Sequence, residues 1–230
     1  MSAFQGRHVV VTGGFGGLGI PVVEGLLDAG AEVHVPDRRG EVPEPLASRP
    51  GVHVISGIDL SDEGSVASVY RSLPGLWASL HVAGGFSMAS VTDTSVAEFE
   101  RMFAMNTVTA FLCSREAVRA IRKSGEGGRI VNVAARPALE PCGGMIAYSV
   151  SKAAVASLTQ SLAIEVAGDR ILVNAIAPSI IDTPANRESM PDADYDKWPK
   201  PADLARTMRY LASPENDVTT GAIVPVYGRA

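Results

Sequence analysis

The sequence predicts an α/β protein with a doubly wound, mostly parallel sheet of seven strands and helices on both of its faces. Three observations predict this fold class. Short runs rich in β-branched residues alternate with longer helical stretches from one end of the chain to the other. A run of glycines follows the first strand and opens the first helix. No internal repeat or low-complexity tract breaks the alternation, so residues 1–230 are predicted to form a single domain.

Each element is predicted from its local pattern. The strands are the β-branched runs at residues 7–12, 31–37, 51–60, 76–85, 128–135, 170–178 and 221–228. The helices lie between them, at residues 20–30, 61–73, 96–123, 147–167 and 201–213. Gly30 should end the first helix, Ser61 should cap the second, and Ser95 with Glu98 has the spacing of a capping box before the third. Residues 41–50 and 183–200 are predicted to be loops.

Composition excludes several classes of protein. The net charge of -5 is opposite to that of a typical nucleic-acid-binding domain, so no nucleic-acid partner is expected. Cys113 and Cys142 form no C-x-x-C pair, and the N-terminus does not resemble a signal peptide, so we expect a cytoplasmic protein. No apolar run approaches the roughly 18 residues of a membrane span. The four histidines are separated in sequence, and no metal site is expected.

The glycine run "VTGGFGGLG", residues 11–19, predicts a phosphate-binding loop. Gly14, Gly16 and Gly19 fit G-x-G-x-x-G, whereas Gly13, Gly17 and Gly19 fit T-G-x-x-x-G-x-G, and the sequence does not choose between them. In either register the glycines allow a tight turn and let the backbone approach a pyrophosphate. The N–H groups and the positive end of the helix that follows favour the same anion. The fold class is therefore refined to a Rossmann fold.

The second strand ends at Asp37, eighteen residues after Gly19. A carboxylate in this position accepts hydrogen bonds from the adenosine ribose and repels a 2′-phosphate, so NAD(H) is favoured over NADP(H). Arg38 and Arg39 weaken this preference because a guanidinium can bind that phosphate. The alternative interpretation of Asp37 is a turn residue before Gly40. Asp59 and Leu60 could flank the adenine, and residues 82–85, "VAGG", would lie beside the adenosine.

Tyr148 and Lys152 lie four residues apart in a predicted helix, and therefore on one face of it. A free tyrosine has a pKa near 10. A neighbouring ammonium and an oxidised, positively charged nicotinamide would both favour the tyrosinate and lower that pKa. The pair therefore predicts a phenol that exchanges protons, with Lys152 also placed to bind the nicotinamide ribose.

Taken together, these motifs resemble the short-chain dehydrogenase/reductase family over nearly the whole chain. The matching pieces are "TGGFGGLG", "VAGG", "MNTVTAF", "IVNVAA", "YSVSK" and "NAIAPSIIDTP". The resemblance implies hydride transfer, with Tyr148 as the acid/base and Lys152 as its helper. It also implies that Asn106 holds a water in a proton relay and that Thr183 contacts the nicotinamide carboxamide. The residues expected to bind the cofactor are Gly13, Phe15, Gly16, Gly17, Leu18, Gly19, Asp37, Arg38, Asp59, Leu60, Ala83, Gly84, Gly85, Tyr148, Lys152, Pro178, Ile181 and Thr183.

Three positions depart from the family pattern. His81 replaces the usual asparagine of the N-x-A-G loop, so that loop is expected to be less firmly braced. Ser179 replaces a glycine after Pro178. Ala135 occupies the place of the serine that orients the substrate.

The missing serine, together with "VAGGF", "GMIAYSVSK" and "DTPANRESMPDADYDKW", resembles the dihydropteridine reductase branch. That resemblance implies reduction of a quinonoid dihydropterin, a flat conjugated acceptor for which a small Ala135 leaves room. The expected substrate-facing residues are Ala135, Arg136 and Asn186, and residues 183–200 are the candidate substrate loop. Because the branch does not keep the relay asparagine, a carbonyl or quinone reductase stays open as an alternative.

Two other functions fit parts of the sequence. A nucleotide-binding regulator with weakened chemistry would fit the loss of the serine. A serine hydrolase would use the S-x-x-K formed by Ser149 and Lys152, but its companion motifs are absent. The small and apolar residues of helices 96–123 and 147–167 suggest a homodimer or homotetramer, although burial within the monomer would explain them equally well.

Overall fold

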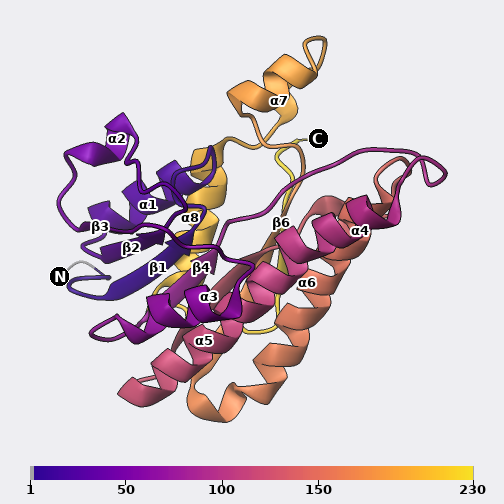
Figure 1. The fold of residues 1–230 in the computed structure, drawn as a ribbon. Coiled ribbons are helices and arrows are strands. Elements are labelled where there is room, and N and C mark those ends of the chain that lie inside the picture. The colour runs from indigo at the N-terminus through magenta and orange to yellow at the C-terminus, as the bar shows by residue number, and fades with distance from the viewer. Residues whose placement is uncertain (1–2, 230) are drawn as a thin grey trace.

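The computed structural model describes residues 3–229 and contains a seven-stranded sheet in the order β3-β2-β1-β4-β5-β6-β7 (Figure 1). The strands are β1 His8–Thr12, β2 Glu32–Pro36, β3 Val52–Ile55, β4 Ala78–His81, β5 Gly128–Val133, β6 Ile171–Pro178 and β7 Ile223–Val226. All six strand pairings are parallel. The predicted doubly wound α/β fold is therefore confirmed. The strand order reverses between β1 and β4, and ligands of such sheets bind at the carboxyl ends of the strands beside this reversal.

Helices cover both faces of the sheet. They are α1 Gly19–Asp28, α2 Glu44–Ala47, α3 Glu63–Arg71, α4 Val96–Phe103, α5 Thr109–Ser124, α6 Ile146–Glu165, α7 Pro184–Ser189 and α8 Pro201–Ala212. Figure 1 shows α1 and α8 on one face, and α3, α5 and α6 on the other. One layer thus combines the first and last long helices of the chain.

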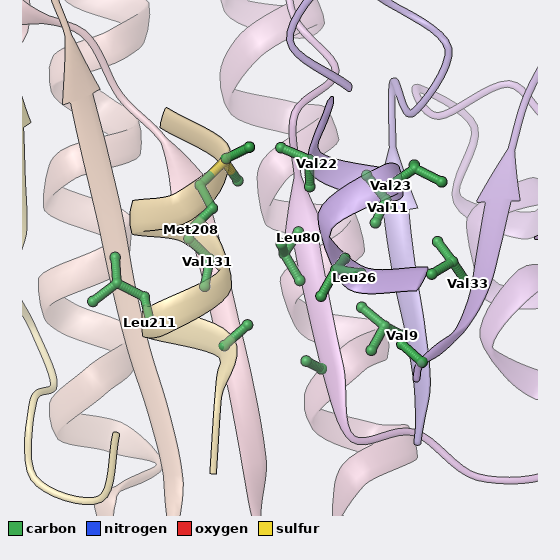
Figure 2. Packing of buried hydrophobic residues seen from close by; sticks show 14 of the residues in the cluster. Val9, Val11, Val22, Val23, Leu26, Val33, Leu80, Val131, Met208 and Leu211 are labelled. Atoms are coloured by element: carbon green, nitrogen blue, oxygen red, sulfur yellow. The ribbon is translucent and has the colours of Figure 1, made fainter. Parts of the chain in front are cut away.

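The core on the α1–α8 face consists of interlocking aliphatic side chains. Leu26 of α1 and Met208 of α8 are fully buried in one cluster with strand residues Val9 and Val131 (Figure 2). Fully burying each such side chain contributes about 1.5–3 kcal/mol. The parallel strands are apolar on both faces because a second cluster packs α3, α5 and α6 on the opposite side. This packing fixes the strand ends from which the candidate site is built.

Several local predictions need correction. Asp62, not Ser61, caps α3 by accepting the Ser65 N–H, because helix α3 begins one residue later than predicted. The predicted helix 96–123 is broken by a π-helical segment, Ala104–Val108, between α4 and α5. The predicted loops 41–50 and 183–200 contain α2 and α7. Ser95 does cap α4 by accepting the Glu98 N–H.

Three of the four histidines, which are separated in sequence, lie close together in space. His34 Nε2 lies 2.9 Å from His8 Nδ1, and the His34 ring stacks on His53 at 4.7 Å. They come together because β1, β2 and β3 are neighbours in register. Even so, within residues 3–229 no group of three or more His, Cys, Asp or Glu side chains has an arrangement that could hold a metal ion. In the same residues no helix is long and apolar enough to cross a membrane.

Candidate functional site

The glycine loop is fixed by contacts between backbone atoms. A Cβ on Gly19 would lie 2.0 Å from the Gly13 oxygen, and one on Gly13 would lie 2.8 Å from Ala83. Gly13 also has a φ of +64°, a conformation that side chains disfavour. Both positions therefore require glycine. Gly19 belongs to both registers, whereas Gly13 belongs only to T-G-x-x-x-G-x-G, so the structure favours that register over the one beginning at Gly14.

The start of α1 is suited to an anion. Its N-cap, Leu18, has no side chain that can satisfy the first backbone N–H groups. Gly16 donates its N–H to the Gly13 oxygen at 3.1 Å, which closes the turn ahead of the helix. The side chains of Phe15 and Leu18 pack toward the core rather than across the loop. The N–H groups and the helix dipole are thus presented together, as a dinucleotide pyrophosphate requires.

The loop 83–85 lies between the glycine loop and the π-helical segment. Ala83 donates its N–H to Thr12 Oγ1, and Gly85 exchanges two hydrogen bonds with the Asn106 side chain. A Cβ on Gly84 would lie 2.6 Å from Asn106 Oδ1 and 3.4 Å from Lys152 Nζ. This loop is therefore firmly braced in spite of His81, contrary to expectation. The structure brings it together with two of the three predicted catalytic residues.

His81, which stands in place of the family asparagine, makes hydrogen bonds through both of its ring nitrogens. Its Nδ1 lies 2.7 Å from Asn132 Oδ1, and its Nε2 lies 2.9 Å from Ser79 Oγ. Ser79 Oγ in turn lies 2.8 Å from the Tyr70 hydroxyl, and Asn132 Nδ2 donates to Thr159 Oγ1. His81 must donate from Nδ1, because Asn132 offers its oxygen there. Burial lowers the pKa of His81 to about 4, so this polar chain across the sheet uses a neutral imidazole.

Asp37 is partly used as a turn residue. Its Oδ1 accepts the N–H groups of Arg39 and Gly40, each at 2.8 Å. The alternative interpretation of Asp37 therefore holds for one oxygen, and Oδ2 is the oxygen that could accept a ribose hydroxyl. Arg38 pairs with Asp59 Oδ1 at 3.1 Å, and hydrogen bonds from Ser61 and then Arg38 lower the pKa of Asp59 to about 2.

Leu60, the other residue expected beside the adenine, packs partly against the core under α3 and α5. Its side chain is therefore partly buried against that core, at the edge of the sheet where Asp59 also lies. Its placement next to an adenine stays a prediction.

Tyr148 and Lys152 lie in α6, with Lys152 one turn further along the helix. Lys152 Nζ donates to the Val133 oxygen at 2.8 Å, which ties α6 to the end of β5. Burial lowers the pKa of Lys152 to about 8. Burial raises the pKa of Tyr148 to about 12, with a smaller contribution from Cys142. Without cofactor the Tyr148 pKa is therefore raised by burial, and its lowering by Lys152 together with an oxidised nicotinamide stays a prediction.

The predicted substrate-facing residues lie in different surroundings. Ala135 is buried just after β5, at the start of a 3₁₀ turn. Arg136 donates to Glu140 at 2.7 Å and lies over the Tyr227 ring. The Asn186 amide donates to the Ile181 oxygen at 2.8 Å and so holds its own segment. Arg136 and Asn186 are thus engaged within the protein.

The end of β6 carries the remaining predicted cofactor residues, Pro178, Ile181 and Thr183. Ser179, the residue in place of the family glycine, bonds through its hydroxyl to the Tyr227 oxygen at 2.9 Å. Thr183 caps α7 by accepting the Asn186 N–H. Its methyl group lies 3.3 Å from where a Cβ on Gly17 would be. Thr183 therefore sits directly against the glycine loop.

Three functional candidates were missed from sequence. Phe86 packs its ring edge-on against Tyr148, with centroids 4.9 Å apart, while its side chain is 58% exposed. Ser151 is fully buried. Its hydroxyl accepts from Asn106 Nδ2 and donates to the backbone carbonyl oxygen of Tyr148. Asp182 binds Arg187 and Lys200. No local pattern announces these contacts, although an aromatic residue directly after "VAGG" could have drawn attention to Phe86.

The site thus combines an anion-binding helix start with a half-buried Tyr148 and a buried Lys152 beside one braced loop. Residues 7–194 match the short chain dehydrogenase family. The chain belongs to this family. It is an NAD(P)-dependent oxidoreductase, and the predicted enzyme class is therefore confirmed.

Relatives of this enzyme have varied activities. It is 36% identical to galactitol 2-dehydrogenase of Rhizobium johnstonii, over 96% of this chain and 94% of that protein. It is 29% identical to the rhamnolipids biosynthesis 3-oxoacyl-[acyl-carrier-protein] reductase of Pseudomonas aeruginosa, over 98% and 96% of the two chains. Its fold superposes on ElxO with NADP bound at a TM-score of 0.90, with 25% identity and coverage of 97% and 98%. The family is therefore established, and the substrate is not set by these relatives.

Proposed function

We propose that this enzyme reduces a small conjugated acceptor at the expense of NAD(P)H, with Tyr148 as the proton donor. The observation that carries the proposal is the placement of Lys152, whose Nζ lies between the Val133 oxygen and the 84–85 loop. One turn earlier on the same helix, Tyr148 is half-buried and its ring packs against Phe86. A half-buried phenol next to a cation is suited to donating a proton to the atom bonded to the carbon that accepts the hydride.

The residues present fit a nicotinamide dinucleotide. The Gly13–Gly19 turn would hold the pyrophosphate, Asp37 Oδ2 the adenosine ribose, and Thr183 the nicotinamide end. When bound, the cofactor supplies the hydride. Lys152 would hold the nicotinamide ribose and, with an oxidised ring, favour ionisation of Tyr148 against the effect of burial. Asn106 would fix the loop that borders this space through its bonds to Gly85.

For the cofactor, we propose a preference for NAD(H) over NADP(H). The Asp37 carboxylate would repel a 2′-phosphate, and Arg38 is already paired with Asp59. ElxO, a structural neighbour, has NADP bound, so the preference needs a direct measurement. The ratio of the dissociation constants of NADH and NADPH decides it, and tighter binding of NADPH would refute the preference.

For the acceptor, we propose a flat conjugated ring. Ala135 places no hydroxyl where the family serine would bind a substrate oxygen, and Phe86 offers an exposed aromatic surface beside Tyr148. The sequence resemblance points to a quinonoid dihydropterin. The exposed apolar side chains of Phe86 and Met88 favour the second candidate, a quinone or aryl carbonyl. Turnover of NADH with a panel of dihydropterins, quinones and diketones separates these classes.

The role of Tyr148 is tested by Tyr148→Phe. Removing the hydroxyl should lower kcat by about 10²–10⁴-fold on the best acceptor of that panel, because no other positioned acid replaces it. Tyr210→Phe, at an exposed tyrosine of α8, is the matched control and should keep full activity. Near-normal turnover by Tyr148→Phe would refute the assignment. Tight NADH binding with no turnover on any acceptor would favour a nucleotide-binding regulator instead.

We also propose that the enzyme forms a homodimer or homotetramer through α4, α5 and α6. These helices expose large apolar side chains that a lone subunit leaves in water: Val96, Phe99, Phe103, Phe111, Val150 and Ile164. Val96 and Ile164 are 74% and 81% exposed. Burying such a surface against its copy would be favourable. Light scattering that gives the mass of a monomer at micromolar concentration would contradict this assembly.

A further inference from the structure

Asp182 occupies an unusual electrostatic position at the end of β6. Arg187 donates from Nε to Asp182 Oδ1 at 2.5 Å and from a terminal nitrogen to Oδ2 at 2.9 Å. Lys200 Nζ donates to the same Oδ2. The Asp182 side chain is only 5% exposed, whereas the side chains of Arg187 and Lys200 are about half exposed. One buried carboxylate therefore binds two cations, and these interactions hold its pKa well below the usual range, through Arg187 first and then Lys200.

This carboxylate joins both ends of the segment 183–200. Asp182 directly precedes the segment and Lys200 is its last residue, and the Asp182 N–H also donates to the Pro199 oxygen at 3.0 Å. Arg187 extends the connection to the middle of α7. Figure 1 shows α7 standing clear of the two helical layers, at the carboxyl edge of the sheet. The three-residue cluster of Asp182, Arg187 and Lys200, here called the Asp182 clamp, thus closes a protruding loop at its base.

The clamp lies next to the candidate nucleotide site. Thr183 directly follows Asp182, and its methyl group lies 3.3 Å from where a Cβ on Gly17 would be. The Thr183 hydroxyl caps α7, so the orientation of α7 and that of Thr183 are coupled. Exposed salt bridges contribute little to stability. A carboxylate as buried as Asp182 differs, because losing its charge leaves two cations without their shared partner.

We propose that Asp182 is a positioning residue that holds Thr183 and α7 over the glycine loop in the conformation that binds the dinucleotide. The proposal rests on the cofactor assignment made above. Asp182 is not placed to touch the reacting atoms. It acts through Thr183 and through the closure of residues 183–200.

The test is Asp182→Asn, which keeps the shape of the side chain and removes its charge. The dissociation constant of the preferred cofactor should rise by about tenfold, the size expected for losing a charge-assisted bond. Cleavage by thermolysin, mapped by mass spectrometry, should accelerate within residues 183–200. Asp169→Asn is the matched control, since Asp169, in the turn after α6, also binds one arginine through two N–H groups, but that arginine, Arg122, lies in the last turn of α5. It should leave both readouts unchanged.

The readouts separate positioning from general stability. Should Asp182→Asn lower the melting temperature yet retain normal cofactor affinity and normal cleavage, Asp182 is only a structural residue and the proposal fails. Should it fail to fold, Arg187→Gln serves instead, because it frees α7 from an exposed partner without burying a lone charge. Arg187→Gln with wild-type affinity and cleavage also overturns the proposal. A wild-type chain that binds neither NADH nor NADPH refutes the cofactor assignment, whereas the cleavage assay still decides whether Asp182 holds the segment.

Discussion

The glycine loop 13–19 and the segment 183–200 face each other at the carboxyl edge of the sheet, but different forces hold them. In the glycine loop, backbone meets backbone, and a single added carbon at Gly19 would overlap the Gly13 oxygen. In the segment 183–200, hydrogen bonds and ion pairs made by side chains hold the backbone in place. Tyr195, for example, donates its hydroxyl toward the oxygens of Met190 and Pro191. One wall of the site is therefore set by steric exclusion, and the other by polar and ionic contacts.

This difference predicts how each wall responds to change. Steric exclusion does not depend on pH or salt, so the glycine loop should fail only when an atom is added to it. Ionic contacts weaken when a partner is neutralised or screened. The segment 183–200 is thus the side of the site whose conformation can change, while the glycine loop should keep its conformation.

The largest expected effect comes from Gly19→Ala. Its Cβ would lie 2.0 Å from the Gly13 oxygen, and backbone on both sides cannot yield. Overpacking of this kind costs about 3 kcal/mol or more, so cofactor binding should fall by at least about a hundredfold. Calorimetric titration with NADH and NADPH measures the loss.

Gly25→Ala is the control within the same helix. No atom lies within 4 Å of where its Cβ would be. Alanine should stabilise the helix there by about 0.5–1 kcal/mol and leave cofactor affinity unchanged. Equal binding by the Gly19 and Gly25 variants would show that the glycine loop is not the rigid wall described above.

Acid should weaken the sheet first, through His34 in β2 and His81 in β4, and the Asp182 clamp only at lower pH. Burial lowers the pKa of both His34 and His81 to about 4, from 6.5 in the unfolded chain. The folded state therefore binds fewer protons, and stability is lost as pH falls from 6.5 toward 4. For the fully buried His81 this amounts to about 3 kcal/mol. The contribution of Asp182, whose folded pKa is depressed, is present above its unfolded pKa and is lost only at lower pH.

Urea unfolding at a series of pH values checks this order. The free energy of unfolding should decline between pH 6.5 and 4, and His81→Asn should flatten the decline because it removes one titrating group. Thermolysin cleavage of residues 183–200 should accelerate only below that range. Cleavage that accelerates near pH 6, before the free energy of unfolding declines, would contradict this prediction, because the segment 183–200 would then open first.

The same contrast explains what could be predicted from sequence. The glycine spacing, the strand–helix alternation and the Tyr148–Lys152 pair are local patterns, and each led to the correct element. The confirmed Rossmann fold and family follow from them. The T-G-x-x-x-G-x-G register could not be chosen from sequence, because the choice depends on Ala83, which follows the neighbouring strand β4 and lies next to Gly13.

The side-chain contacts of the site were beyond sequence reasoning. The role of Asn106 in holding a water stays a prediction, whereas the bonds of its side chain to Gly85 and Ser151, in a π-helical segment, could not be predicted from periodicity. The raised pKa of Tyr148 in the protein without cofactor could not be predicted, because burial, unlike the spacing to Lys152, is a tertiary property. The Asp182 clamp joins residues up to eighteen positions apart, so it appears only once α7 and α8 are in place.

The smallest expected effect concerns Ala135, where the family places a serine. Ala135 lies two residues after Val133, whose oxygen binds Lys152, so a hydroxyl added there would enter the Tyr148–Lys152 neighbourhood. Ala135→Ser should raise kcat/KM for simple ketones by about fivefold, the value of one net hydrogen bond. A flat conjugated acceptor should gain nothing, because its reacting atom does not need that donor. The ratio of kcat/KM for a ketone and a quinone, measured on wild type and variant side by side, reports the change. A parallel gain on both acceptors would mean that Ala135 limits catalysis in general rather than selecting the acceptor.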